Sequence, residues 1–311
     1  MSTPGCAEHA PPPARPATAA RSPTMNCFSV DVEEYYHAEV FHHRLTVSER
    51  DRLPRRAALF IEQIAELLES HESRATFFVL GAAVRYLAPL LRSLAERGHE
   101  IACHGYDHQH LSRLSPEEFR EDLRRARGVL ENAAGVSPRG YRAPTFSVTH
   151  ATSWALDIII EEGFEYDASI FPIRHDRYGV PRAPTEPFWA EAPSGARIIE
   201  FPPLTLNWRL MRLPVGGGGY LRLLPGCVVR HCVAARQRTG TPTMLYVHPW
   251  ELDPEQPRIP LPLSSRWRHR VNLHKTEDKL RRLLEAHQFD TADNILRTIR
   301  HDRANASYSL K

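Results

Sequence analysis

From residue 26 onward, short apolar runs alternate with longer segments in which apolar residues recur every three or four positions. The short runs are typical of buried strands, and the longer spacing is typical of helices that pack through one face. We expect strands at Cys27–Val30, Ala75–Leu80, Glu100–Cys103, Gly140–Ala143, Glu165–Ser169 and Met244–Val247. We expect helices at Arg55–Ser70, Ala83–Arg97, Ser115–Ala133, Ala151–Glu162, Leu221–Arg238, Lys275–His287 and Ala292–Ile299.

Local signals support several of these boundaries. Ser115 as N-cap, Pro116 in the first turn and Glu118 at the third position form a capping box, which predicts a helix start. Thr291 is expected to cap the last helix. In the helix at 55–70 the apolar positions predict one buried face, made of Leu59, Phe60, Ile64, Leu67 and Leu68.

The repeated strand–helix order predicts an α/β fold with parallel strands, either a barrel or a doubly wound sheet. In such folds the functional residues gather at the carboxyl ends of the strands. Residues 172–225 interrupt the rhythm, because they are rich in Pro and Gly and contain the run Gly216–Gly219. We expect them to form a loop-rich insertion on the rim.

The first 24 residues are rich in Pro, Ala, Ser and Arg and are predicted to be a disordered tail. They lack the apolar core of about 7–15 residues that a secretory signal needs. Met25 stands directly before the first predicted strand and is an alternative start. We expect residues 25–311 to form one catalytic domain.

The bulk composition is that of an ordinary soluble enzyme, with 311 residues, 42% hydrophobic and 25% charged. A net charge of +3 without a basic, aromatic-bearing stripe argues against nucleic-acid binding. The five cysteines are an odd count without close spacing, which argues against a disulfide framework and a cysteine zinc site. No apolar run approaches the roughly 20 residues of a membrane span.

Residues that bind metals or move protons gather after the predicted strands. His104 and His108 follow one strand, and the acidic cluster that begins at Asp31 follows another. Two imidazoles and at least two carboxylates are enough for a metal ion and a base. Five polar residues fall at such strand ends, which predicts a single site: Asp31, His104, Arg142, Asp167 and His248.

Four segments in this order resemble the polysaccharide deacetylase family, carbohydrate esterase family 4: SVDVEEYYH, HGYDHQHL, GYRAPTFS and YVHPWELDPEQPRI. With YDASIFP and GGGGYLRLLP they are most similar to the branch encoded with exosortase-linked exopolysaccharide loci. The resemblance extends from about Met25 to Ile299. It implies a distorted (β/α) barrel, which agrees with the alternation of strands and helices.

The family's first motif has two adjacent aspartates, the first a base and the second a metal ligand. Here Val32 follows Asp31, and the spacing Asp31-x-Glu33 fits a variant with one residue between the two acids. Because side chains alternate along a strand, Asp31 and Glu33 can point to the same side. The resemblance therefore implies Asp31 as the base and Glu33 as the ligand, with Glu34 as the alternative ligand.

By the same resemblance, Glu33, His104 and His108 hold a divalent metal ion. Zinc suits this set of nitrogen and oxygen ligands best, and cobalt or nickel also fit it. Such an ion lowers the pKa of its water and polarises the substrate carbonyl.

The remaining roles are also implied by the resemblance. Arg142 holds Asp31 through a charge-assisted hydrogen bond. The backbone N–H of Thr145 stabilises the oxyanion, and His248 protonates the departing amine. Asp167 is a candidate partner of Arg142 or His248, or else an ordinary turn-capping residue.

Aromatic side chains on the predicted loops could stack against sugar rings. Tyr36, Trp208 and Trp250 are the substrate-binding candidates, with Tyr35 beside them. Packing as lids over the core is the alternative for all four.

The sequence therefore favours a metal-dependent hydrolase that removes N-acetyl groups from amino sugars of a bacterial exopolysaccharide or its precursor. One alternative is a catalytically idle carbohydrate-binding homologue, which the residue Val32 motivates. Another is an amidohydrolase acting on a small non-sugar amide. The expected partner is an N-acetylated oligo- or polysaccharide, and the expected location is the cytoplasm or the inner face of the inner membrane.

Overall fold

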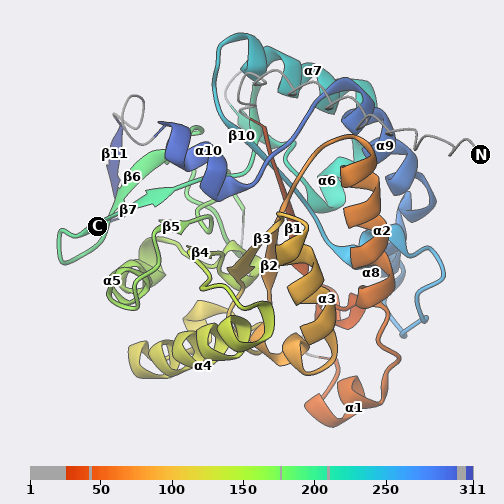
Figure 1. The fold of residues 1–311 in the computed structure, drawn as a ribbon, viewed down its shortest axis with the longest axis horizontal. Helices are drawn as coiled ribbons and strands as arrows, with labels where there is room; N and C mark the ends of the chain where they lie inside the picture. The colour runs from red at the N-terminus through yellow and green to blue at the C-terminus, as the bar shows by residue number, and fades with distance from the viewer. Residues whose placement is uncertain (1–25, 42–43, 176, 209–210, 300–305, 311) are drawn as a thin grey trace, which may run out of the picture.

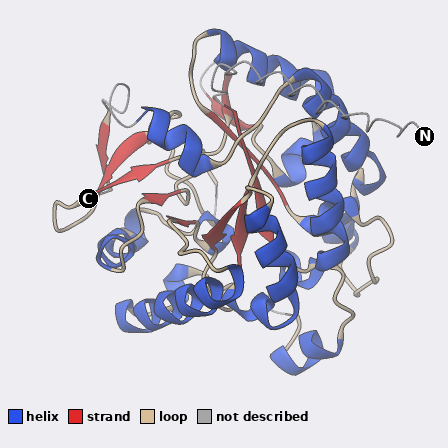
Figure 2. Cartoon of the chain, in the orientation of Figure 1, coloured by secondary structure: helices blue, strands red, loops and turns tan. Residues whose placement is uncertain are grey.

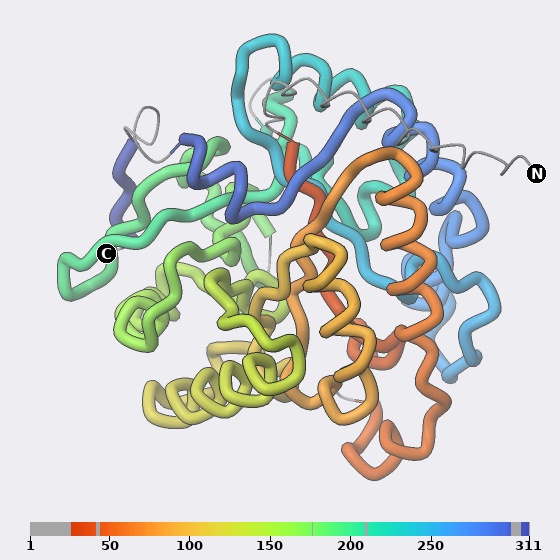
Figure 3. Tube along the Cα trace, viewed as in Figure 1, coloured from red at the N-terminus to blue at the C-terminus, as the bar shows by residue number. Residues whose placement is uncertain are grey.

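The computed structural model describes residues 26–41, 44–175, 177–208, 211–299 and 306–310. The predicted tail and the alternative start Met25 lie outside these residues. In the described part of the chain, helices surround a mainly parallel sheet (Figure 1, Figure 2). The trace also shows that the late strand β10 lies beside the first strand, β1 (Figure 3).

The main sheet of the described residues has nine strands in the order β10-β1-β2-β3-β4-β5-β7-β6-β11. Neighbours from β10 to β7 pair in parallel, β6 is antiparallel to β7, and β11 is parallel to β6. Their bounds are β1 Asn26–Val32, β2 Thr76–Val79, β3 Glu100–Cys103, β4 Gly140–Tyr141, β5 Tyr166–Asp167, β6 Phe188–Glu191, β7 Arg197–Glu200, β10 Thr243–Val247 and β11 Ser307–Ser309. This is a distorted, open (β/α) barrel, so the expected α/β fold with parallel strands is confirmed.

Strand β1 shows how the sheet positions polar residues. All seven of its residues are buried, because β10 and β2 flank it and both faces are covered. Phe28, Val30 and Val32 belong to the core cluster that contacts the surrounding helices. Since side chains alternate along a strand, Ser29 and Asp31 point to the other face, toward the interior of the barrel.

The helices have these bounds: α1 Val47–Arg52, α2 Ala57–Ser70, α3 Val84–Glu96, α4 Pro116–Ala134, α5 Trp154–Glu161, α6 Gly218–Leu223, α7 Gly226–Arg238, α8 Leu263–Arg270, α9 Thr276–Ala286 and α10 Ala292–Ile299. The capping box predicted for α4 is present, since the backbone N–H of Ser115 donates to Glu118 and that of Glu118 donates to Ser115. Gly135 ends α4 in the left-handed conformation, with φ of 74°. None of the helices in the described ranges combines the length and the apolar character that a membrane span requires.

The prediction of a loop-rich insertion at 172–225 is wrong in part. Strands β6 and β7 lie within it and extend the main sheet, with β7 paired to β5. Two further strands, β8 (Thr205–Trp208) and β9 (Met211–Pro214), form a separate antiparallel pair. These strands are only four residues long and are bounded by Pro and Gly, so the hydrophobic pattern was too short to reveal them.

Two helix predictions also need correction. The helix expected at Leu221–Arg238 is two helices, α6 and α7, separated at Pro225. Proline disfavours the helical conformation of the residue before it, and Leu224 accordingly adopts an extended conformation, with ψ of 145°. Leu59, placed on the buried face of α2, is 65% exposed, whereas Phe60 is buried as expected.

Candidate active site

A cavity of about 440 Å³ lies at the carboxyl ends of the parallel strands. Asp31 reaches it from β1, His108 from the loop after β3, and His248 from the end of β10. The strands lie side by side in the sheet, so residues far apart in the sequence meet at one edge. The sheet order therefore explains why these strand ends share one cavity.

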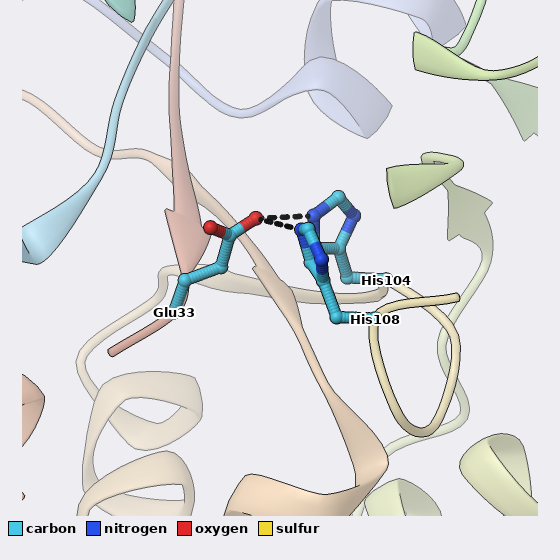
Figure 4. Close-up of side chains that lie close together, drawn as sticks. All are labelled: Glu33, His104 and His108. Carbon is cyan, nitrogen blue, oxygen red and sulfur yellow. Dashed lines mark hydrogen bonds and ion pairs between the residues drawn. The ribbon is translucent and has the colours of Figure 1, made fainter. Parts of the chain in front are cut away.

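A compact cluster of three potential metal ligands borders this cavity. The Oε1 atom of Glu33 lies 3.0 Å from Nε2 of His104 and 2.7 Å from Nε2 of His108. All three side chains are buried, and one ligand atom from each lies within 4.8 Å of the others. Figure 4 shows both imidazole rings directed at the same carboxylate oxygen.

The hydrogen bonds behind this cluster suit a cation. The Nδ1 atom of His104 lies 2.7 Å from the backbone oxygen of Arg142. Because a carbonyl oxygen can only accept, Nδ1 carries the hydrogen and Nε2 is the atom available to bind an ion. Two imidazole nitrogens and one carboxylate oxygen are a donor set that binds divalent ions such as zinc.

The charge state of Glu33 also suits a ligand. Burial raises the pKa of this carboxyl group, but its electrostatic interactions with the neighbouring His108, His248 and His104 side chains outweigh that effect. The pKa of Glu33 is therefore held well below its usual range, and the carboxylate is ionised at neutral pH.

Asp31 is held by a buried arginine at the bottom of the cavity. The Oδ1 atom of Asp31 accepts a hydrogen bond of 2.5 Å from Nη1 of Arg142, whose side chain is fully buried. Arg142 also donates to the Ser29 hydroxyl at 3.0 Å and to the backbone oxygen of Ala168 at 3.2 Å. These contacts fix the guanidinium, so Asp31 keeps one orientation and its Oδ2 atom faces the cavity side, toward His248.

His248 carries a positive charge that buried acids stabilise. Its Nδ1 atom donates to Oε1 of Glu251 at 2.5 Å, and Oε2 of Glu251 accepts from Nε of Arg222 at 2.8 Å. Burial lowers the pKa of His248, but the carboxylates of Glu33, Glu251 and Asp31 raise it to about 9 overall. His248 was predicted from the sequence, whereas Glu251 and Arg222 were not, although Glu251 lies only three residues after His248 in the chain.

Thr145 lies on the cavity wall in an uncommon backbone conformation. Its φ is 58° and that of the next residue, Phe146, is 51°, both in the left-handed region. Such residues carry a conformational cost that folded proteins retain mostly at functional turns. The Thr145 hydroxyl lies 3.5 Å from Oε2 of Glu39, which also borders the cavity.

Asp167 does not contact either expected partner, Arg142 or His248. It accepts a hydrogen bond of 2.5 Å from the Ser169 hydroxyl and faces Glu200, its neighbour in the β5–β7 register. Burial raises the pKa of Asp167 to about 6, and burial with the adjacent Asp167 carboxylate raises the pKa of Glu200 well above its usual value. Of these two buried acids, Glu200 is therefore the one more readily protonated.

Glu34, the alternative ligand, faces away from the cluster. Its carboxylate accepts the backbone N–H groups of Arg56 and Ala57 at the start of α2, at 2.9 to 3.2 Å. Burial raises its pKa, and these hydrogen bonds offset part of the rise. Glu34 thus caps a helix while its neighbour Glu33 faces the histidines.

The aromatic candidates separate into two groups. Trp250 lines the cavity and stacks on His248, with ring centroids 5.1 Å apart. Tyr35 and Tyr36 pack in a small core cluster, and Trp208 is 55% exposed on β8; none of the three lines the cavity. Four other aromatic residues line the cavity, and the sequence did not predict this: Phe146, Tyr178, Tyr220 and Tyr246.

The fold is a distorted (β/α) barrel with a mainly parallel sheet. Residues 51–159 match the family model of polysaccharide deacetylase. Residues 168–297 match a second model, a domain of unknown function, DUF3473. The match to the polysaccharide deacetylase model thus extends over about a third of the chain.

Curated relatives match part of the chain. A peptidoglycan deacetylase of Helicobacter pylori is 24% identical over 110 residues, which is 35% of this chain and 36% of that protein. A chitooligosaccharide deacetylase of Bradyrhizobium is 35% identical over 82 residues, 26% of this chain and 37% of that protein. The matched region thus spans about a third of the length of these relatives.

Solved structures share the fold over nearly the whole chain. A protein of Mycobacterium smegmatis, provisionally named a polysaccharide deacetylase, is 22% identical with a TM-score of 0.57, covering 92% of this chain and 94% of that one. Puue allantoinase is 16% identical with a TM-score of 0.58, covering 90% and 91%. At these identities the likeness is one of fold.

Proposed function

We propose that this protein is a metal-dependent hydrolase that removes N-acetyl groups from amino sugars of a bacterial exopolysaccharide or its precursor. The observation that carries the proposal is the meeting of three groups at one cavity: the cluster of Glu33 with two histidines, the clamped carboxylate of Asp31, and the charged ring of His248. Amide hydrolysis needs an electrophile to polarise the carbonyl, a base and an acid, and the cavity borders all three.

A divalent ion held by Glu33, His104 and His108 would polarise the acetamide carbonyl and lower the pKa of water. Zinc is the ion that we propose, and cobalt or nickel would substitute for it. Three protein ligands leave positions open for water and substrate, as in catalytic rather than structural zinc sites.

Asp31 acts as the base in this proposal. Arg142 occupies its Oδ1 atom, so Oδ2 is the oxygen that takes the proton of the attacking water. The Nε2 atom of His248 lies 3.9 Å from Oδ2, beyond hydrogen-bonding distance, so the two groups act separately on the same reacting centre.

The backbone N–H of Thr145 would donate to the oxyanion that forms when water adds to the carbonyl. His248 then protonates the leaving amine, for which its raised pKa keeps it charged at neutral pH. Trp250 orients the imidazole of His248 by stacking on it, and Glu251 fixes the ring by accepting a hydrogen bond from its Nδ1 atom.

Three further points support the choice of substrate. The named relatives act on peptidoglycan and chito-oligosaccharides, which are acetylated amino-sugar chains. The aromatic wall of the cavity suits stacking against sugar rings. The motif resemblance to the exosortase-linked branch suggests an exopolysaccharide, with action in the cytoplasm or at the inner face of the inner membrane on a precursor.

The test is acetate release from acetylated amino-sugar oligomers by metal-stripped protein reconstituted with zinc or cobalt. We expect metal-dependent release that falls by about a thousandfold in Asp31→Asn, the range for loss of a general base. Metal content of the variant, measured in parallel, should stay at one ion per chain.

Two other functions give different results in the same assay. A catalytically idle carbohydrate-binding homologue would bind one metal ion per chain and release no acetate from any sugar. An amidohydrolase for a small non-sugar amide would not be inhibited by chito-oligosaccharides. The clamped Asp31 and charged His248 favour the enzyme, because a binding protein needs neither base nor acid.

A further inference from the structure

Residues that follow none of the parallel strands directly contribute arginine side chains to the cavity wall. Four arginines line the cavity: Arg44, Arg177, Arg222 and Arg268. Two of them have carboxylate partners, since Arg177 lies 3.5 Å from Glu39 and Arg222 lies 2.8 Å from Glu251. The positive charge of these two is therefore balanced within the protein.

For the other two arginines, the described residues provide no such partner. Arg44 and Arg268 are both exposed to solvent, and no carboxylate among the described residues forms an ion pair with either side chain. An arginine on an open surface is usually hydrated. An arginine that lines a cavity beside a reaction centre is available to a ligand.

The two arginines belong to one part of the wall. The backbone N–H of Arg44 donates to the backbone oxygen of Phe41 at 2.9 Å. The ring of Phe41 packs on His269, the residue after Arg268, with centroids 5.0 Å apart. Ser265 lies three residues before Arg268 on α8, on the same face of the helix, and also lines the cavity.

The acids of the cavity do not balance this charge. Asp31 is paired with Arg142, Glu39 is close to Arg177, and Glu33 lies between two histidines. The charged ring of His248 adds to the excess. A concave site whose lining carries net charge of one sign concentrates ions of the opposite charge, so this positively charged cavity attracts anions.

We propose that the cavity takes an anionic glycan, in which Arg44 and Arg268 bind a carboxylate or phosphate close to the N-acetylated sugar. This inference rests on the proposed function, since it names the substrate class of the same site. Arginine binds both groups through paired, charge-assisted hydrogen bonds. The two sources of charge are a uronic acid within the glycan and the diphosphate of an activated precursor.

Binding to the metal-loaded protein, measured by calorimetry, distinguishes these cases. Three probes differ in charge: fully N-acetylated chitotetraose, called chitotetraose below, is neutral, a hyaluronan tetrasaccharide carries carboxylates, and UDP-N-acetylglucosamine carries a diphosphate. We expect at least one anionic probe to bind about tenfold more tightly than chitotetraose. The anionic probe that is favoured identifies the source.

The variants Arg268→Gln and Arg44→Gln should each weaken binding of that anionic probe about tenfold and leave chitotetraose unchanged. Arg266→Gln is the matched control, because Arg266 is also exposed on α8 but does not line the cavity. Equal binding of all three probes would overturn the proposal. Equal losses of binding in Arg266→Gln and Arg268→Gln would also overturn it, because they would indicate a general electrostatic attraction instead of a binding site.

Acetate release measured with the same probes separates this inference from the proposed function. If chitotetraose is deacetylated without any preference for charge, the anionic subsite is wrong and the deacetylase stands. If the anionic probe binds through Arg268 and no probe releases acetate, the subsite stands and the deacetylase is wrong.

Discussion

His104 and His248 meet at the same cavity, but they differ in what holds the inner nitrogen of the ring. The Nδ1 atom of His104 donates to a neutral backbone oxygen, that of Arg142. The Nδ1 atom of His248 donates to the carboxylate of Glu251. A carbonyl fixes the tautomer and leaves Nε2 available to an ion, whereas a carboxylate stabilises the charged ring.

The difference extends to the groups behind each ring. The ligand side is held by main-chain atoms of the loop after β4, so no single side-chain change removes its support. The acid side depends on Glu251, which is fully buried, and on Arg222, which also donates to the backbone oxygens of His269 and Val271. The acid side can therefore be altered by mutation without touching the ligand side.

The largest expected effect separates the two histidines directly. His104→Ala should abolish binding of the metal ion and, with it, acetate release. His248→Ala should retain one metal ion per chain while kcat falls by about a thousandfold, because only the acid is lost. Metal analysis of dialysed protein beside kcat measurements checks both; equal metal content in the two variants would contradict the assignment.

A smaller effect tests the carboxylate behind His248. In Glu251→Gln the partner of Nδ1 becomes neutral, so the pKa of His248 falls from its raised value. Because the acid must be protonated, the alkaline limb of the kcat/KM profile should move to lower pH, with about tenfold loss at pH 8. An unchanged alkaline limb would show that its pKa belongs to a group other than His248. Metal content is the control and should not change.

Most of the fold could be predicted from the sequence where the signals were long or local. The hydrophobic pattern located β1, β3 and α10 within a residue or two, and the capping box located the start of α4. The pattern failed at β6 and β7, where strands of four residues compete with the turn residues around them.

In the site, too, features with local sequence signals could be predicted, and features that depend on strand pairing could not. The alternation of side chains expected along a strand favoured Glu33 over Glu34 as the ligand, and Glu33 is the one that faces the two histidines. Nothing local predicted that Asp167 would lie beside Glu200, since that position depends on the pairing of β5 with β7. Sequence alone also did not show that Trp208 lies on β8 and outside the cavity lining, because that position depends on the pairing of β8 with β9.

The smallest effect concerns stability without metal. The pKa of His248 is raised to about 9 in the folded protein, above the ordinary value of 6.5, so its protonated ring contributes stability fully below about pH 6.5. That contribution is lost as pH rises through about 9, and Glu251→Gln should remove part of it. The difference in unfolding free energy between wild type and Glu251→Gln should therefore shrink by about 1 to 2 kcal/mol from pH 6 to pH 9.5, since one pKa unit corresponds to about 1.4 kcal/mol.

The loss of the Arg222 ion pair in the variant adds an offset that does not depend on pH in this range, because both partners stay charged. Urea unfolding at a series of pH values separates the two terms, and a difference that stays constant with pH would mean that Glu251 does not act through the charge of His248.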